Sequence, residues 1–321
     1  MTLEQFFSAA SDFIWGMPLL ILLLGGGFFF MVYSRFLPFR YFRHAVNVLR
    51  GKYDDPDDPG DINHFQALSG ALAATIGMGN ISGVALAIFA GGPGAIFWMW
   101  VSAFFGMATK FFTCTLSVMY RGKDSAGELQ GGPMYYIREG LGKNWMPLAI
   151  LFSIVGFFGA TPVFQANQMV VVIRDVFLEP YGLAFKDQFY TDLTVGLVIA
   201  VLVAAVILGG IKRIGNVASK LVPAMVILYT ISVVLILLLN FSEVIPSFLF
   251  IIEDAFSAKA ALGGAFGMIV IEGAKRAAFS NEAGIGTAPM MHGAAKTKEP
   301  VREGLVAMLG PAIDTLLICT M

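Results

Sequence analysis

The chain has 321 residues, of which 57% are hydrophobic and only 13% are charged, and its mean hydropathy is +0.75. These values exclude an ordinary soluble domain and are typical of a membrane protein. The formal net charge of −1 gives no sign of a nucleic-acid partner. We therefore expect an all-α polytopic protein whose surroundings are the lipid bilayer.

Apolar segments long enough to cross a bilayer recur along the whole sequence. Each is bounded by polar or charged residues, as the ends of membrane spans usually are. The sequence predicts spans at Ile14–Tyr33, Phe65–Ala90, Ala95–Met119, Met146–Ile173, Leu193–Gly210, Leu221–Asn240, Leu262–Ile285 and Gly304–Met321.

The basic residues alternate between the loops that join these spans. The loops within 35–52, 121–143, 212–220 and 296–302 hold 15 of the 21 Lys and Arg residues. The opposite loops hold Arg174, Lys186 and Lys259. Because basic loops stay in the cytoplasm, we expect a multi-pass protein of the plasma (inner) membrane with its N-terminus outside.

The second span contains an unusual polar interruption. Its centre reads Gly77-Met78-Gly79-Asn80-Ile81-Ser82-Gly83 in an otherwise apolar run. Glycines weaken a helix, and broken backbone at membrane depth occurs only where it faces protein or a water-filled cavity. The freed N–H and C=O groups can then hold an ion or a substrate, as in transporters with discontinuous helices.

Two other interpretations of this interruption exist. The small residues Ser69, Ala73 and Gly77 could form a close helix-packing face, but packing alone does not require Asn80 beside them. A dinucleotide-binding loop is excluded by context, because no strand precedes it and no acidic residue follows about 20 residues later.

The seventh span carries a second interruption. Glu272 lies three and four residues before Lys275 and Arg276, which is the helical spacing for ion pairs. The polar run Phe279–Gly284 (FSNEAG) follows and predicts a helix end. The two interruptions lie five spans apart, which is the spacing of corresponding helices in two inverted five-helix repeats when the first span is counted as an extra.

The remaining polar residues give weaker signals. His44, His64 and His292 show no metal-ligand spacing and are expected to be solvated near the cytoplasmic side. Cys114 and Cys319 lie far apart in predicted spans, so we expect small apolar fillers and no disulfide.

Four motifs together indicate a family. They are GMGNISGVALAIFAGGPGAIFWMWVSAFFGMATKF, GGPMYYI, FQANQ and FSNEAGIGTAP. From Phe65 to its end the chain closely resembles the alanine or glycine:cation symporters, which are sodium-coupled transporters with the leucine-transporter fold. It departs from the family at Met78, where threonine is common, and at Ala277-Ala278, which replaces a Gly-Leu type pair.

The resemblance implies a 5+5 inverted repeat of about ten core helices with an extra N-terminal helix. On this scheme the sequence stops after core helix 7, so we expect a fragment of a longer protein. The expected domains are 1–64 (extra helix and cytoplasmic loop), 65–240 (first repeat) and 241–321 (incomplete second repeat).

The resemblance also implies a binding site. An amino-acid carboxylate suits N–H groups at the start of a half-helix, and its ammonium suits carbonyls at the end of another. The expected substrate contacts are Gly77, Met78, Gly79, Gln165, Phe279, Ser280 and Asn281. For Gln165, an interhelical hydrogen bond is the alternative role.

Sodium needs oxygen ligands, and no other cofactor is expected. By likeness to the leucine-transporter fold, one ion would use Thr75, Asn80 and Ser280, and a second ion would use Ala73 and Ile76 together with core helix 8. The expected function is sodium-coupled symport of alanine or glycine by alternating access. An ion channel or another cation-coupled transporter is the alternative. A membrane enzyme is less favoured, because no nucleophile and base pair or metal cluster is found.

Overall fold

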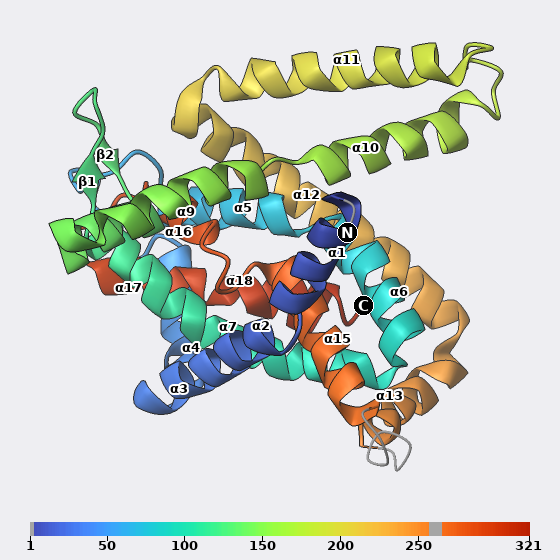
Figure 1. The fold of residues 1–321 in the computed structure, drawn as a ribbon, viewed down its shortest axis with the longest axis horizontal. Coiled ribbons are helices and arrows are strands. Elements are labelled where there is room, and N and C mark those ends of the chain that lie inside the picture. Colours follow the sequence, from blue (N-terminus) through green and yellow to red (C-terminus); the bar gives the residue numbers. More distant parts are fainter. Residues whose placement is uncertain (1–2, 257–264) are drawn as a thin grey trace.

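The computed structural model describes residues 3–256 and 265–321, and most of these are helical (Figure 1). The helices are α1 (Leu3–Ile14), α2 (Met17–Leu20), α3 (Gly26–Tyr33), α4 (Leu37–Leu49), α5 (His64–Thr75), α6 (Met78–Gly91), α7 (Gly94–Met119), α8 (Pro133–Tyr136), α9 (Met146–Gly159), α10 (Val163–Val172), α11 (Gln188–Ile207), α12 (Gly210–Leu239), α13 (Phe241–Ala255), α15 (Ala265–Asn281), α16 (Ala288–His292), α17 (Pro300–Ala307) and α18 (Leu309–Pro311).

Shorter elements complete the fold. Wider helical turns of the π type extend α2, α8, α10 and α18 at Ile21–Gly25, Ile137–Leu141, Ile173–Leu178 and Ala312–Ile318, and a 3₁₀ turn, Lys143–Trp145, precedes α9. The strands β1 (Gly122–Lys123) and β2 (Leu129–Gln130) form a small antiparallel hairpin after α7. Its turn is stabilised by Asp124, whose carboxylate accepts hydrogen bonds from the N–H groups of Ala126 and Glu128.

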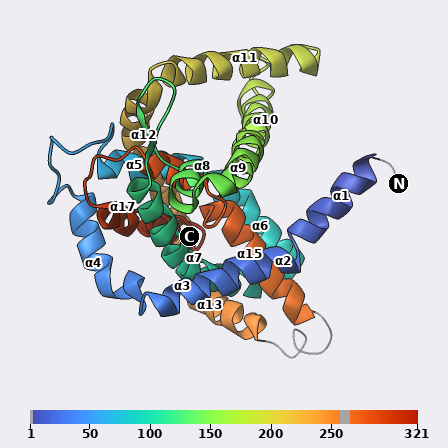
Figure 2. The same cartoon turned by 60° about the vertical axis from the view of Figure 1, so that its left-hand side comes forward.

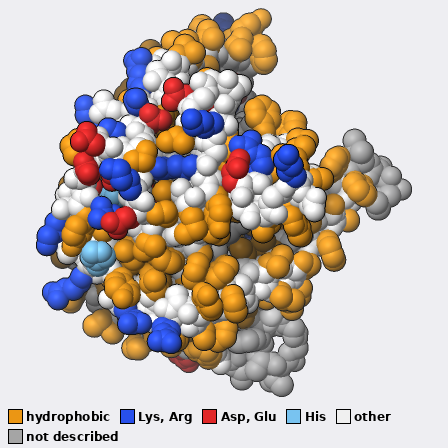
Figure 3. Space-filling view, turned by 90° about the vertical axis from the view of Figure 1, so that its left-hand side faces the viewer, with side chains coloured by type: hydrophobic (Ala, Val, Ile, Leu, Met, Phe, Trp, Pro, Cys, Tyr) orange, Lys and Arg blue, Asp and Glu red, His pale blue; other side chains and the backbone are white. Residues whose placement is uncertain are grey.

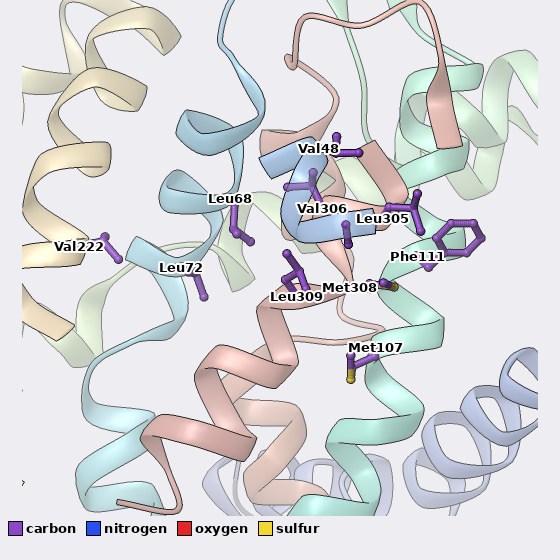
Figure 4. Packing of buried hydrophobic residues seen from close by; sticks show 11 residues of the cluster. Val48, Leu68, Leu72, Met107, Phe111, Val222, Leu305, Val306, Met308 and Leu309 are labelled. Atoms are coloured by element: carbon purple, nitrogen blue, oxygen red, sulfur yellow. The ribbon is translucent and has the colours of Figure 1, made fainter. Parts of the chain in front are cut away.

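Helix α7 is the centre of the molecule. It packs against α3, α13, α15, α16 and α17, and more than half of its apolar length is buried. Close approach to α15 depends on Gly273, because a Cβ there would lie 2.5 Å from the carbonyl oxygen of Ala95. The main apolar core joins α4, α5, α7, α12 and α17 (Figure 4). Its buried members are Ala45, Val48, Leu68, Leu72, Met107, Phe111, Val222, Leu305, Val306, Met308 and Leu309.

Helices α10, α11 and α12 present the opposite situation. The α10–α11 pair extends from the rest of the molecule in both ribbon views (Figures 1 and 2). Only 6% of the apolar window of α11 and 11% of that of α12 is buried. Since exposed leucine, isoleucine and valine side chains are stable in hydrocarbon, these faces are suited to lipid.

The start of α5 follows from a local sequence signal. The side chain of Asn63 accepts a hydrogen bond from the N–H of Gln66 at 2.8 Å, and the side chain of Gln66 accepts one from the N–H of Asn63 at 3.1 Å. This reciprocal capping box satisfies two N–H groups that would otherwise have no helical partner. The helix therefore begins at His64.

The prediction of solvated histidines is wrong for His64 and His292. Their exposed fractions are 1% and 0%, and the Nδ1 atom of each ring is hydrogen-bonded to the carboxylate of Glu303, which is itself fully buried. Local sequence gives no sign of this, because Glu303 lies 239 residues after His64. These three residues are called the His-Glu-His cluster below. They lie at the first position of α5, at the last position of α16 and within α17, so the cluster connects these three helices.

The predicted spans are confirmed only in part. Among the described residues, three single helices (α7, α11 and α12) are long and apolar enough to cross a membrane. Two bent pairs also qualify, Met17–Tyr33 with α4 and α5 with α6. The fourth span is not one helix, because α9 ends at Gly159 and α10 begins after Pro162, which cannot donate a backbone hydrogen bond.

Three further boundaries differ from the prediction. The sixth span begins earlier, because α12 starts at Gly210 and includes Lys212, Arg213 and Lys220, for which the sequence predicts a loop. Helix α13 was not predicted. Its residue Asp254 accepts a hydrogen bond from the N–H of Gly94 at 2.8 Å and so connects α13 to the start of α7. The start of the seventh span, at Leu262, lies outside the described residues.

Candidate functional site

The predicted interruption of the second span is present. Helix α5 ends at Thr75, Ile76 adopts an extended conformation, and α6 begins at Met78, with a bend of 44° between the two helices. The N–H of Gly77 donates to the side-chain oxygen of Asn80 at 2.8 Å. One backbone group that the break frees is therefore satisfied by the polar residue of the motif.

The predicted end of the seventh span is also present. Helix α15 ends at Asn281, and Glu282 and Gly284 follow with φ angles of 53° and 94°. The amide oxygen of Asn281 accepts from the N–H of Ala283 at 2.9 Å, and its nitrogen donates to the hydroxyl of Thr315 at 2.9 Å. Upstream in α15, Glu272 forms the expected ion pairs with Lys275 and Arg276, at 3.4 and 3.8 Å.

The two interruptions meet at a buried carboxylate. Asp314 lies in the π-helical segment Ala312–Ile318 and has an exposed fraction of 0%. Its carboxylate oxygens accept hydrogen bonds from the side-chain nitrogen of Asn80 (2.8 Å) and from the hydroxyls of Ser280 (2.7 Å) and Thr315 (2.9 Å). We call these four residues the Asp314 cluster. Cys319 borders it, with its sulfur 3.3 Å from Asn80 Nδ2 and from Ser280 Oγ.

The cluster is chemically suited to a small hard cation. A carboxylate in an apolar interior is stable only when it is hydrogen-bonded or paired with a positive charge. Carboxylate and hydroxyl oxygens are the ligand types that alkali and alkaline-earth ions prefer, and Asp314, Ser280 and Thr315 bring such oxygens together. The hydroxyl groups can rotate, so they can serve as donors to the carboxylate or as acceptors toward a cation.

Glycine lets the two broken helices approach each other. A Cβ at Gly79 would lie 3.1 Å from the Cα of Ser280 and 3.6 Å from the ring of Phe279. The start of α6 therefore contacts the end of α15 directly. The N–H groups of Met78 and Gly79, in the first turn of α6, have no hydrogen-bond partner among the described residues. This places the positive end of one helix dipole beside the negative end of another.

Not all predicted site residues lie at the cluster. Asn80 and Ser280 belong to it, and Gly77, Met78, Gly79, Phe279 and Asn281 lie beside it. Thr75 is buried, but its hydroxyl donates to the carbonyl of Leu72 at 3.3 Å. Ile76 is half-buried, and Ala73 lies on the exposed side of α5.

Gln165 is also apart from the cluster. It is exposed on α10, which packs against α11 and the π-helical segment that follows it. The structure does not bring its side chain to Asp314 or to the start of α6.

Asp314 and Thr315 were missed in the sequence. The signal was present, because Asp314 is the one acidic residue in the apolar segment Gly304–Met321. An ionisable residue inside a membrane span is by default a candidate functional residue.

Discontinuous helices around a buried polar cluster, within a bundle that exposes long apolar faces, define a class of protein: a polytopic membrane transporter. The sequence matches the sodium:alanine symporter family over residues 1–321. The chain belongs to this family. The resemblance read from the four motifs is thus confirmed, and the protein is a transporter and not an enzyme.

Several curated relatives support this assignment. An uncharacterized transporter of Haemophilus influenzae is 46% identical over 100% of this chain and 69% of its own length. The sodium/alanine symporter AgcS of Methanococcus maripaludis is 44% identical over 98% of this chain and 68% of its own. The probable sodium/glutamine symporter GlnT of Bacillus subtilis is 37% identical over 99% and 64%. The chain therefore spans about two thirds of the length of these relatives, and the coupling ion of the family is sodium.

Proposed function

We propose that this protein moves a small neutral amino acid, alanine or glycine, into the cell together with sodium by alternating access. The observation that carries the proposal is the carboxylate of Asp314, buried at the meeting point of two interrupted helices. Membership in a sodium-coupled family supports the coupling ion. The 5+5 inverted repeat, the domain boundaries and the outward N-terminus stay predictions.

Sodium would bind at the Asp314 cluster. The carboxylate supplies the negative charge, and the hydroxyls of Ser280 and Thr315 supply further oxygens. The amide oxygen of Asn80 caps Gly77 while its nitrogen faces the carboxylate, so in this arrangement Asn80 orients Asp314. Breaking the cap at Gly77 would free that oxygen as a ligand, which would couple ion binding to the conformation of the break.

The amino acid would bind next to this ion. Its carboxylate would accept hydrogen bonds from the N–H groups of Met78 and Gly79, at the positive end of α6. Its ammonium would lie toward the carbonyls of Phe279 and Ser280, at the end of α15. Because α6 and α15 touch at Gly79, only a small side chain is expected to fit between them.

Uptake of labelled alanine into proteoliposomes tests the proposal. With an inward sodium gradient, the wild-type protein should accumulate alanine, and an equal potassium gradient should give none. Asp314→Asn should weaken the apparent sodium affinity about tenfold or more, because a hydrogen bond or contact to a charged group is worth about 1.5 to 3 kcal/mol. Asp55→Asn is the matched control, since Asp55 is an exposed loop carboxylate.

Four results would count against the proposal. Uptake without a cation gradient would indicate a channel, and uptake that follows another cation would indicate a different coupling ion. Equal sodium dependence of Asp314→Asn and the wild type would remove Asp314 from the ion site. An excess of unlabelled glutamine that competes as well as alanine would assign the substrate preference named for GlnT, and it would contradict a small-residue site.

A further inference from the structure

The corner between α3 and α4 turns the chain sharply. The axis of α4 makes an angle of 79° with the helical run Met17–Tyr33, and the corner residues Arg35 and Phe36 have φ angles of 55° and 58° (Figure 2). Residues 17–33, before the corner, include no charged residue and are long enough by themselves to cross the bilayer, whereas α4 contains Arg40 and Arg43. A helix that leaves such a run at nearly a right angle lies along the membrane surface, where polar headgroups meet acyl chains.

The two faces of α4 fit this position. Ala45 and Val48 are fully buried and pack in the core with α17. Phe39 and Phe42, in contrast, are 58% and 42% exposed, and exposed arginines flank them in the sequence. Exposed aromatic rings together with basic side chains on one helix are typical of segments that lie in the membrane interface.

An apolar groove lies beside α4. Its volume is about 360 Å³, and α4, α7 and the segment Ala312–Ile318 form its walls. Every lining side chain is apolar: Pro38, Phe39, Phe42, Phe104, Met107, Ala312, Leu316 and Leu317. No polar group is present in this lining to orient a soluble metabolite, so the groove suits a hydrocarbon chain.

The charge of the stretch that contains α4 is strongly one-sided. From Phe13 to Tyr53 the sequence has no Asp or Glu. The basic residues of this stretch are all exposed, and none forms a salt bridge within the described residues: Arg35, Arg40, Arg43, Arg50 and Lys52. In the space-filling view of the side that carries α4 and α17, basic groups border a broad hydrophobic surface (Figure 3). A cluster of five such residues beside a membrane span attracts anionic lipid headgroups.

We propose that α4 and its groove bind an anionic phospholipid from the bilayer. One acyl chain lies between α4, α7 and the segment Ala312–Ile318, and the headgroup phosphate is held by Arg40 and Arg43. The apolar groove and the basic residues together favour an anionic lipid over other ligands. A free phosphate has no hydrocarbon chain to fill the groove, and a zwitterionic lipid has no net charge to match the basic residues. The groove shares the segment Ala312–Ile318 with the Asp314 cluster, but no residue of the cluster lines it. The proposal does not depend on the transported substrate.

Native mass spectrometry of the detergent-purified protein tests the site. The protein is mixed with phosphatidylglycerol or phosphatidylcholine of identical chains, and the retained lipid adducts are counted. The wild type should retain phosphatidylglycerol about tenfold better, because two arginines act on one headgroup. The double variant Arg40→Gln/Arg43→Gln should retain the two lipids nearly equally. Its matched control is Lys123→Gln/Lys143→Gln, which removes two exposed basic residues elsewhere and should keep the preference.

A second pair of variants tests the groove. Leu317→Trp should fill it and lower retention of both lipids, whereas Leu193→Trp, on the exposed face of α11, should not. If Leu317→Trp does not give a monodisperse protein, Phe39→Gln tests the same wall from a side chain that is 58% exposed.

The following outcomes would overturn the proposal. They are equal retention of both lipids by the wild type, a preference that survives in the arginine double variant, and a preference lost equally in the lysine control. Full retention by Leu317→Trp and by Phe39→Gln would leave only a charged surface without an acyl site. Leu317→Trp could also remove a dimer peak while the lipid adducts persist. This result would show that the groove binds a second copy of the chain and not a lipid.

Discussion

Replacement of Glu303 by alanine should destabilise the protein strongly. Glu303 has an exposed fraction of 0% and accepts hydrogen bonds from the Nδ1 atoms of His64 and His292, both of which are buried. Without the carboxylate, two imidazole groups keep their buried positions and lose their partner. The Nε2 atom of His292 already has no hydrogen-bond partner within the described residues, so this ring would have none at all.

The size of the effect follows from these contacts. Removing one member of a buried charge-assisted network costs about 3 to 5 kcal/mol, because the remaining groups stay desolvated. A stability change of 1 kcal/mol shifts the melting temperature by about 2 to 4 °C in a domain of 150 to 250 residues. For Glu303→Ala we therefore expect a fall of about 10 °C. Glu303→Gln should lose about half as much, because one amide oxygen can still accept from one imidazole.

Thermal unfolding in detergent, followed by size-exclusion chromatography, measures this prediction as an apparent melting temperature. Glu299→Ala is the matched control, because Glu299 lies one helical turn earlier and forms a more exposed ion pair with Arg302 at 2.8 Å. Exposed pairs contribute about 0 to 1 kcal/mol. A Glu303→Ala protein that melts together with the Glu299→Ala protein would show that the His-Glu-His cluster does not stabilise the junction of α5, α16 and α17.

Three further predictions concern the site and the loop that holds Asp58. Gly79→Leu should abolish alanine binding in a calorimetric titration, because even a Cβ there lies 3.1 Å from the Cα of Ser280; retained binding would contradict the contact between α6 and α15. Asn80→Ala should weaken sodium dependence of uptake more than it lowers protein yield, since it removes a donor to the carboxylate and the cap of the break. Asp58→Asn should lower the melting temperature by an amount that shrinks below about pH 4. The hydrogen bond from Lys298 holds the pKa of Asp58 below its ordinary value of 3.8, so this carboxylate stabilises the fold above that pH and loses its effect as acid protonates it; a difference that stays constant down to pH 3 would refute the pairing.

The two helix interruptions could be predicted because their causes are local. Glycines and a single amide within an apolar run mark the break at Gly77, and the polar run after Phe279 marks the end of α15. The ion pairs of Glu272 were predictable for the same reason, since helical spacing alone brings the partners together.

The missed features depend on contacts between distant segments. His64 is buried because Glu303, far along the chain, provides its partner, and no local pattern shows this. The position of Gln165 relative to the site depends on how α10 packs against α11 and the segment that follows it. The sequence around Gln165 does not determine this packing. Asp314 is a different case: its position in an apolar segment was a local signal, but its role became visible only when Asn80 and Ser280 were placed around it.

The break at Gly77 and the carboxylate of Asp314 stabilise each other. A carboxylate at membrane depth costs about 2.5 to 3.5 kcal/mol on insertion, and donors must offset this cost. Asn80 can donate to Asp314 only with its nitrogen, and the N–H of Gly77 fixes that orientation by occupying the amide oxygen. In a continuous helix the N–H of Gly77 would bond to a backbone carbonyl, and the Asn80 amide would be free to turn either way. The glycine-rich motif is therefore needed for the orientation of the charged group as well as for the bend of the helix.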